Sequence, residues 1–143
     1  MKIAVAGTGY VGLVTGVCLA EHGHLVTCVD VDEKKVELMK KGVSPIYEEG
    51  LPELMVKNME RLTFTTDYAS AYRDAEVIFI GVGTPEKVEG SANLKYVYTV
   101  AKQIAQSVEK DCVVVVKSTV PIGTNDKVED FIRSNLVHSV NID

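Results

Sequence analysis

Near the start of the chain, three glycines stand in the pattern G-x-G-x-x-G, at Gly7, Gly9 and Gly12. Ile3 and Val5 before them are typical of a buried strand, and the apolar stretch after them is typical of a helix. In such a strand, turn and helix, the first glycine permits the tight turn, the second lets a phosphate approach the backbone, and the third lets the helix lie close to the strand. The amides at the helix N-terminus then favour an anion. The pattern predicts a dinucleotide-binding site.

A carboxylate follows the second expected strand, at residues 25–29. Asp30 comes 18 residues after Gly12, close to the spacing of about 20 at which an acid binds the adenosine ribose in such sites. Because the same carboxylate would repel a 2′-phosphate, the sequence predicts NAD and not NADP. Alternatively, Asp30 only starts the turn that follows it, as aspartate often does. Lys35, one turn into the next helix, either covers the ribose or is simply a solvated lysine.

Strand and helix patterns alternate along the whole chain, without an internal repeat or a linker. We expect strands at residues 2–6, 25–29, 62–66, 77–82 and 112–116, and helices at residues 10–21, 33–41, 52–58, 68–73, 94–108 and 125–137. Asn93 is the expected N-cap of the fifth helix, and residues 140–143 look like the lead into a sixth strand. The alternation predicts an α/β fold of the Rossmann type, a doubly wound parallel sheet with helices on both faces.

The fourth and fifth expected strands are continuously apolar, which is typical of parallel strands buried on both faces. In such a sheet, ligands bind outside the carboxyl ends of the strands. Residues 83–85 and 118–123 follow these two strands, so we expect them to lie beside the glycine turn and Asp30. The hydroxyls of Thr84 and Thr119 can donate or accept hydrogen bonds there. Alternatively, both threonines cap the loops that follow them.

The chain has 143 residues, of which 46% are hydrophobic and 24% are charged. This composition predicts one globular domain over residues 1–143. A net charge of −5 argues against a nucleic-acid partner. No apolar run approaches the roughly 18 residues that span a membrane, and no signal-peptide pattern precedes the first strand. We therefore expect a cytoplasmic protein without a membrane partner.

The cysteines and histidines show no pattern of metal ligands. Cys18, Cys28 and Cys112 lack the spacing of a metal site, and we expect all three to be small buried hydrophobic residues and none a nucleophile. His22 and His24 lie where the first helix should end, a position that favours cations. No further ligands lie near these two histidines in the sequence, so no metal site is predicted.

Four segments together resemble one enzyme family. They are GTGYVG at residues 7–12, SPIYEEGL at 44–51, VGTP at 82–85 and KSTVPIGT at 117–124. In this order they closely resemble the UDP-glucose 6-dehydrogenases, and the resemblance runs the whole length of the chain. Tyr47 favours UDP-glucose enzymes over GDP-mannose enzymes. Glu49 and Asn93 depart from the family, which commonly has proline and aspartate at these positions, but neither departure removes a cofactor contact.

The resemblance implies an oxidation of the sugar C6 alcohol to a carboxylate, with two hydride transfers to NAD. Thr119 is implied to lie close to the reacting water as an auxiliary catalytic residue. The family's main catalytic residues, its central helix and its UDP-sugar domain are expected beyond residue 143. The full-length family is homo-oligomeric and serves nucleotide-sugar metabolism and polysaccharide biosynthesis. The cofactor-binding residues that the resemblance implies are Gly7, Thr8, Gly9, Tyr10, Val11, Gly12, Asp30, Lys35, Val82, Gly83, Thr84, Pro85, Ser118, Thr119 and Val120.

Two classes of function remain open. The chain is either the NAD-binding portion of a UDP-glucose, GDP-mannose or other nucleotide-sugar 6-dehydrogenase, or a stand-alone NAD(H)-binding sensor without catalysis. The loop at residues 117–124 favours the dehydrogenase, because a sensor needs no hydroxyl beside the nicotinamide. We expect the chain alone to bind NAD weakly and to show no turnover of UDP-glucose.

Overall fold

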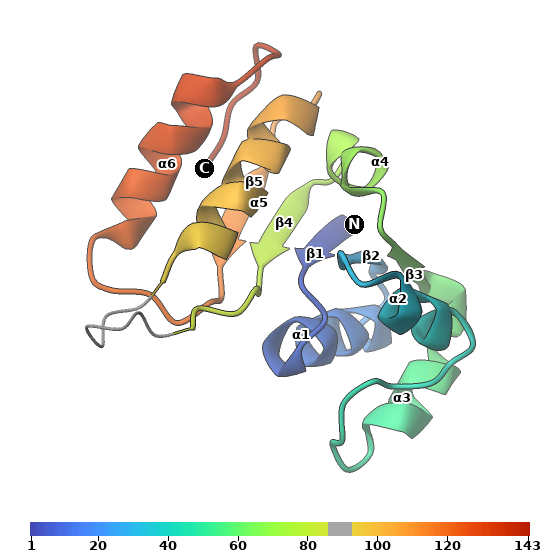
Figure 1. Cartoon of the computed structure of the whole chain (residues 1–143). Helices are drawn as coiled ribbons and strands as arrows, with labels where there is room; N and C mark the ends of the chain where they lie inside the picture. The colour runs from blue at the N-terminus through green and yellow to red at the C-terminus, as the bar shows by residue number, and fades with distance from the viewer. Residues whose placement is uncertain (86–92) are drawn as a thin grey trace.

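The computed structural model describes residues 1–85 and 93–143. Within these residues, five parallel strands form a single sheet (Figure 1). The strands are β1 (Lys2–Ala6), β2 (Leu25–Val29), β3 (Leu62–Thr65), β4 (Val77–Ile80) and β5 (Val113–Val116). Their spatial order is β3-β2-β1-β4-β5, so the chain moves outward from β1 first in one direction and then in the other. The predicted doubly wound parallel sheet is confirmed.

Helices cover both faces of this sheet (Figure 1). They are α1 (Tyr10–Glu21), α2 (Glu33–Lys40), α3 (Leu51–Lys57), α4 (Tyr68–Arg73), α5 (Lys95–Ser107) and α6 (Thr124–Asn135), with a short 3₁₀ turn, η1 (Met59–Arg61), before β3. α3 and α6 begin one residue earlier than predicted, because each directly follows a glycine with positive φ, Gly50 at 82° and Gly123 at 90°. At α5, Asn93 accepts a hydrogen bond from the Lys95 amide at 3.0 Å, but the N-cap itself is Leu94, one residue later than predicted.

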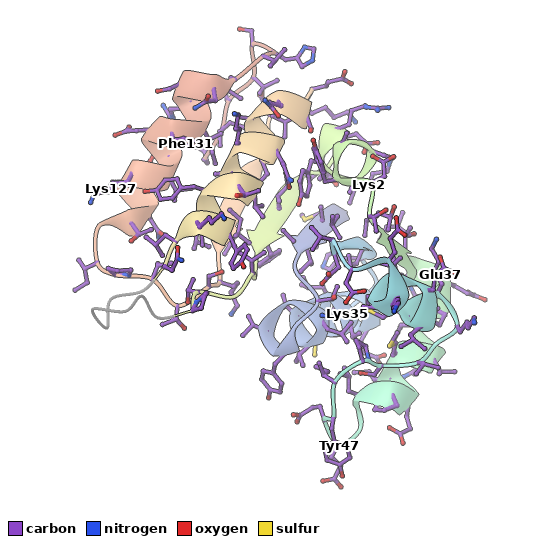
Figure 2. The ribbon with its side chains drawn as sticks, in the orientation of Figure 1. Lys2, Lys35, Glu37, Tyr47, Lys127 and Phe131 are labelled. Carbon is purple, nitrogen blue, oxygen red and sulfur yellow. The ribbon has the colours of Figure 1, made fainter. Side chains whose placement is uncertain are left out.

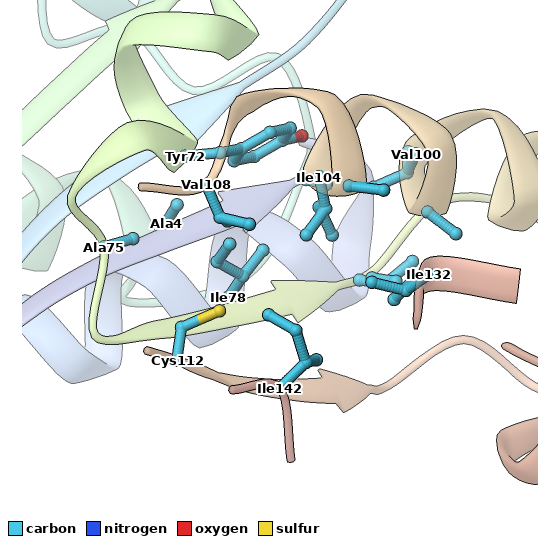
Figure 3. Close-up of a cluster of buried hydrophobic side chains, with 14 of the residues drawn as sticks. Ala4, Tyr72, Ala75, Ile78, Val100, Ile104, Val108, Cys112, Ile132 and Ile142 are labelled. Atoms are coloured by element: carbon cyan, nitrogen blue, oxygen red, sulfur yellow. The ribbon is translucent and has the colours of Figure 1, made fainter. Parts of the chain in front are cut away.

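Each face of the sheet has its own buried core. Side chains of α4, α5 and α6 surround one core, in which Ile78, Ile104 and Ile132 are buried together (Figure 3). Side chains of α1, α2 and α3 surround the other core. β1 contributes to both cores, Ala4 to the first and Val5 to the second, because alternate residues of a strand point to opposite faces. Each fully buried isoleucine stabilises the fold by roughly 1.5–3 kcal/mol.

Two strands are less buried than predicted. Val77 and Phe79 of β4 are half-buried, and their neighbours in register on β5, Val113 and Val115, are exposed and half-buried. α1 packs on β1, β2 and β3, so the described residues cover this face of β4 and β5 only in part. The expectation of burial on both faces is therefore wrong. An apolar run indicates a strand but does not tell which neighbours will cover it.

The last residues of the chain run alongside β5. Ile142 forms a parallel bridge with Cys112. The Cys112 amide donates to the Asn141 carbonyl at 3.1 Å, and the Val114 amide donates to the Asp143 carbonyl at 2.7 Å. The lead into a sixth strand is thus present as a single bridge. Within residues 1–85 and 93–143, no helix has both the length and the apolar character needed to cross a membrane.

Candidate functional site

The turn between β1 and α1 requires glycine at two of its three positions. Gly7 has a φ of 97°, which L-residues rarely adopt, and a Cβ there would lie 2.9 Å from the carbonyl oxygen of Gly81. A Cβ on Gly12 would lie 1.9 Å from the carbonyl oxygen of Gly7, so only glycine lets α1 lie this close to the turn. The Gly7 amide also donates to the Val29 carbonyl at 2.8 Å, which fixes the turn against the end of β2.

Gly9, between these two glycines, is not required by the fold. Its φ of −72° is open to any residue, and a Cβ at this position would meet no atom within 4 Å. Gly9 is also the N-cap of α1, where no side chain caps the helix and the first turn holds no acidic residue. The aligned peptide dipoles of such a helix end favour an anion. The space in front of Gly9 therefore fits a pyrophosphate that approaches the backbone closely.

Asp30 lies at the carboxyl end of β2, beside this turn. Its Oδ2 atom accepts hydrogen bonds from the Thr8 hydroxyl and from the Thr8 amide, the latter at 3.1 Å, and lies 3.5 Å from the Lys35 ammonium. Its Oδ1 atom accepts from the Asp32 amide at 2.9 Å. Burial opposes the negative charge, but the Thr8 hydroxyl, the Asp32 amide and Lys35 outweigh it and hold the pKa of Asp30 below its ordinary value. Asp30 thus starts the turn, as the alternative interpretation has it, and also presents a charged carboxylate.

A cavity of about 350 Å³ opens at the carboxyl ends of β1, β2 and β4. Lys35 of α2, labelled in Figure 2, is one of the residues that line it. β1 and β4 are the neighbours between which the strand order reverses, which is where ligands bind in sheets of this kind. The structure brings together here seven of the residues expected to bind a cofactor: Gly7, Thr8, Gly9, Asp30, Lys35, Val82 and Gly83.

The other expected residues do not line this cavity. Tyr10 and Val11 are exposed in the first turn of α1, and Thr84 is half-buried in the loop after β4. The Ser118 hydroxyl donates to the carbonyl of Val82 at 2.7 Å, which ties the loop after β5 to the loop after β4. The remaining four are Gly12, buried under the turn, Val120, half-buried, and Pro85 and Thr119, both exposed.

One wall of the cavity was not predicted from the sequence. Tyr96, Thr99, Val100 and Gln103 of α5 line it, together with Tyr72 of α4. The α5 residues recur at helical spacing on one face, which is a recognisable pattern. The pattern alone indicates only a buried face, because the sequence of α5 does not show that this face lies opposite a ligand site at the carboxyl ends of the strands. Aromatic, aliphatic and amide side chains on one surface suit a flat heterocyclic ring.

The cysteines divide into two buried residues and one exposed residue. Burial raises the pKa of Cys28 to about 12 and, with the carboxylates of Asp111 and Asp143, that of Cys112 to about 11. Cys18 is exposed, so its expected burial is wrong. α1 is apolar nearly all round, and its composition therefore does not tell which side meets the sheet. No cluster of three or more potential metal ligands occurs in the part of the chain that the structure describes.

The open space before the uncapped N-terminus of α1 and the charged carboxylate at the end of the next strand match the pyrophosphate and a ribose of a dinucleotide. The class that fold and site define is therefore a dinucleotide-binding domain. Residues 1–143 also match the family model of the NAD binding domain of UDP-glucose/GDP-mannose dehydrogenases. The chain belongs to this family, and NAD as its cofactor is confirmed.

Similar proteins are known from sequence and from structure. The chain is 54% identical over 144 residues to the UDP-glucose 6-dehydrogenase YwqF of Bacillus subtilis, with 99% of the chain covered and 33% of that protein. It is 47% identical to a UDP-glucose 6-dehydrogenase of Pseudomonas aeruginosa, with 95% and 30% covered. The chain thus spans about a third of the length of these relatives.

Solved structures show the same arrangement. A UDP-glucose dehydrogenase from Pyrobaculum islandicum superposes with a TM-score of 0.92 at 36% identity, covering 98% of this chain and 34% of its own. A GDP-mannose dehydrogenase from Pseudomonas aeruginosa, solved as a ternary complex, gives a TM-score of 0.87 at 39% identity, covering 99% and 35%. The expected resemblance to nucleotide-sugar dehydrogenases is confirmed.

Proposed function

We propose that residues 1–143 are the NAD-binding domain of a UDP-glucose 6-dehydrogenase, which oxidises UDP-glucose to UDP-glucuronate with two NAD. The observation that carries this proposal is the glycine at position 9. The fold does not need glycine there, whereas a ligand that approaches the backbone closely would need it. The relatives named UDP-glucose 6-dehydrogenase, at 47–54% identity, support the choice of substrate. NAD supplies the hydride acceptor, and this domain supplies its binding and orientation.

The cofactor would lie along the carboxyl edge of the sheet. The amides at the start of α1 would hold the pyrophosphate, and Asp30 with Lys35 would hold the adenosine ribose. The wall of α5 that includes Tyr96 and Val100 would take the adenine ring. The nicotinamide would then lie toward residues 82–85 and 118–120, where the exposed Thr119 would orient a water molecule. An ordinary hydroxyl is a poor base at neutral pH, so Thr119 has only an auxiliary role in this proposal.

The sugar site and the main catalytic residues of the proposed enzyme lie outside residues 1–143. The relatives are about three times as long as the chain, which supports this division. GDP-mannose is the second candidate substrate, favoured by the similarity to a GDP-mannose dehydrogenase structure. Tyr47, which favours UDP-glucose, projects from the loop before α3 and is 97% exposed (Figure 2). We place the whole enzyme in the cytoplasm, where NAD and nucleotide sugars are both supplied.

Calorimetric titration of the purified chain with NAD and with NADP tests the cofactor site. We expect weak binding of NAD, weaker binding of NADP, and a loss of NAD affinity in Asp30→Ala. Incubation with NAD and UDP-glucose should give no NADH, because positioning of the alcohol, worth about 7–11 kcal/mol of barrier, needs the missing sugar site. A chain that binds no NAD would overturn the proposal. If the gene encodes a longer product, its assay with UDP-glucose and with GDP-mannose distinguishes the two substrates.

A further inference from the structure

Thr8, the residue between the first two glycines of the turn, is unusual in being a fully buried polar side chain. It is 0% exposed, and among the described residues only Asn58 and Thr124 are also polar and buried. Its hydroxyl does not face the open space in front of Gly9. It donates instead to Oδ2 of Asp30, which also accepts from the Thr8 backbone amide at 3.1 Å. One residue of the phosphate-binding turn therefore holds the ribose-binding carboxylate with two donors.

The donors around Asp30 are distributed unevenly over its two oxygens. Oδ2 is approached by three donors, the Thr8 amide, the Thr8 hydroxyl and the Lys35 ammonium. Oδ1 accepts from one donor among the described residues, the Asp32 amide at 2.9 Å. Each carboxylate oxygen has two lone pairs, so Oδ2 is fully engaged and Oδ1 keeps one lone pair for a further donor. A ribose hydroxyl would find its acceptor at Oδ1.

Given the proposed NAD function, we infer that Thr8 is a positioning residue for cofactor selectivity: its hydroxyl fixes the Asp30 carboxylate so that Oδ1 is presented to the ribose. The side-chain rotation that Thr8 restrains is intrinsically soft, because the terminal torsion of aspartate is broad. Without this hydroxyl, the carboxylate would be held by the backbone amides of Thr8 and Asp32, one on each oxygen, and by the Lys35 ammonium at 3.5 Å from Oδ2.

The loss of this hydroxyl should affect the two cofactors differently. A hydrogen bond from the ribose of NAD depends on the orientation of the carboxylate, since it weakens steeply away from linear geometry. The repulsion of the NADP 2′-phosphate depends mainly on the distance between the charges, which a rotation hardly changes. Removing the Thr8 hydroxyl should therefore weaken NAD binding and leave NADP binding nearly unchanged. A threonine that only filled the core would show no such difference.

The test compares Thr8→Val, which keeps the shape and removes the hydroxyl, with Thr8→Ser, which keeps the hydroxyl. Thr124→Val is the matched control, because Thr124 is also buried, at 3% exposure, and lies at the start of α6. Calorimetry should give an NAD affinity about tenfold lower in Thr8→Val, the scale of one hydrogen bond to a charged group. NADP affinity should stay within about twofold, and both Thr8→Ser and Thr124→Val should bind NAD as the unmodified protein does.

Thermal unfolding of each variant shows that the comparison is made between folded proteins. Should Thr8→Val not fold, Thr8→Ala removes the same hydroxyl with less demand on the core and takes its place. In an Asp30→Asn background the removal of the hydroxyl should no longer change the NAD to NADP ratio. Folded Thr8→Val with unchanged NAD affinity, or with NAD and NADP weakened equally, would overturn the inference. Failure of the unmodified protein to bind NAD would instead overturn the proposed function on which the inference rests.

Discussion

The substitution Gly9→Ala separates the contribution of this glycine to the fold from its contribution to cofactor binding. In the free protein the new methyl group meets no atom within 4 Å, and the φ of −72° suits alanine. Removing a glycine from the unfolded chain stabilises a protein by about 0.4–1 kcal/mol when the native conformation is compatible. Alanine is a poorer N-cap than glycine, which costs a similar amount. The two effects offset each other, so the free energy of unfolding should change by less than about 1 kcal/mol.

Binding of NAD should respond much more strongly. In the proposed binding mode, the methyl group occupies the space through which the pyrophosphate approaches the amides of α1. Hydrogen bonds from backbone amides to a charged group are worth about 1.5–3 kcal/mol each. Losing one of them corresponds to a decrease in affinity of roughly 10- to 100-fold.

Two measurements on the same preparations check this prediction. Thermal unfolding should place Gly9→Ala within about 4 °C of the unmodified protein, the shift expected for up to 1 kcal/mol in a domain near this size, and calorimetry should show the loss of NAD affinity. Gly12→Ala is the contrasting variant, because its Cβ would lie 1.9 Å from the Gly7 carbonyl oxygen and should destabilise the fold severely. Gly9→Ala with normal NAD affinity would show that Gly9 does not face the pyrophosphate. Unfolding of Gly9→Ala would show that the fold does need this glycine.

Further predictions concern the charge of Asp30, the reactivity of the cysteines and the contribution of the ADP-ribose half of NAD to binding. Because the folded state holds the pKa of Asp30 below its ordinary value of about 3.9, the stability that its charge contributes is present above that pH and is lost as the pH falls below it. The difference in unfolding free energy between the unmodified protein and Asp30→Asn should therefore shrink in denaturant titrations below about pH 4. A thiol reagent should label the native fold at Cys18 and spare Cys28 and Cys112, and mass spectrometry of the labelled peptides would show any exception. ADP-ribose should bind almost as tightly as NAD, and a calorimetric advantage for NAD of more than about tenfold would contradict this.

The parts of the fold that depend on nearby residues could be predicted from the sequence. The glycine turn, the strand before it and Asp30 are set by the sterics and polarity of adjacent positions, and all three lie where they were expected. α3 and α6 begin one residue before their predicted starts, because a glycine in a sequence can be either the last residue of a loop or a helix cap. Gly50 and Gly123 take the second role through their positive φ.

The features that could not be predicted depend on contacts between distant segments. Whether Val113 is buried depends on which segment covers its face of β5, and the apolar sequence of β5 does not show this. The same holds for Cys18, since α1 is apolar on the side away from the sheet as well. The α5 wall with Tyr96 became part of the candidate site only because α5 crosses back over the sheet to the cavity beside Asp30. Asp30 could be predicted from its neighbours in the sequence, whereas the α5 wall opposite it depends on tertiary packing.

The two ends of the candidate site differ: the side chain of Asp30 is held by several donors, whereas Thr119 and Pro85 are exposed. This difference bears on how the domain would hold NAD. Around the ribose position, Asp30 has four donors and a side chain only 12% exposed, so its geometry is set before any cofactor arrives. Toward the proposed nicotinamide position, Thr119 and Pro85 are exposed and do not line the cavity beside Asp30. In the proposed binding mode, this preorganised end holds NAD by its adenosine half, which does not react. The reacting half then stays accessible to whatever carries the alcohol, which is why binding and chemistry are expected to separate in this chain.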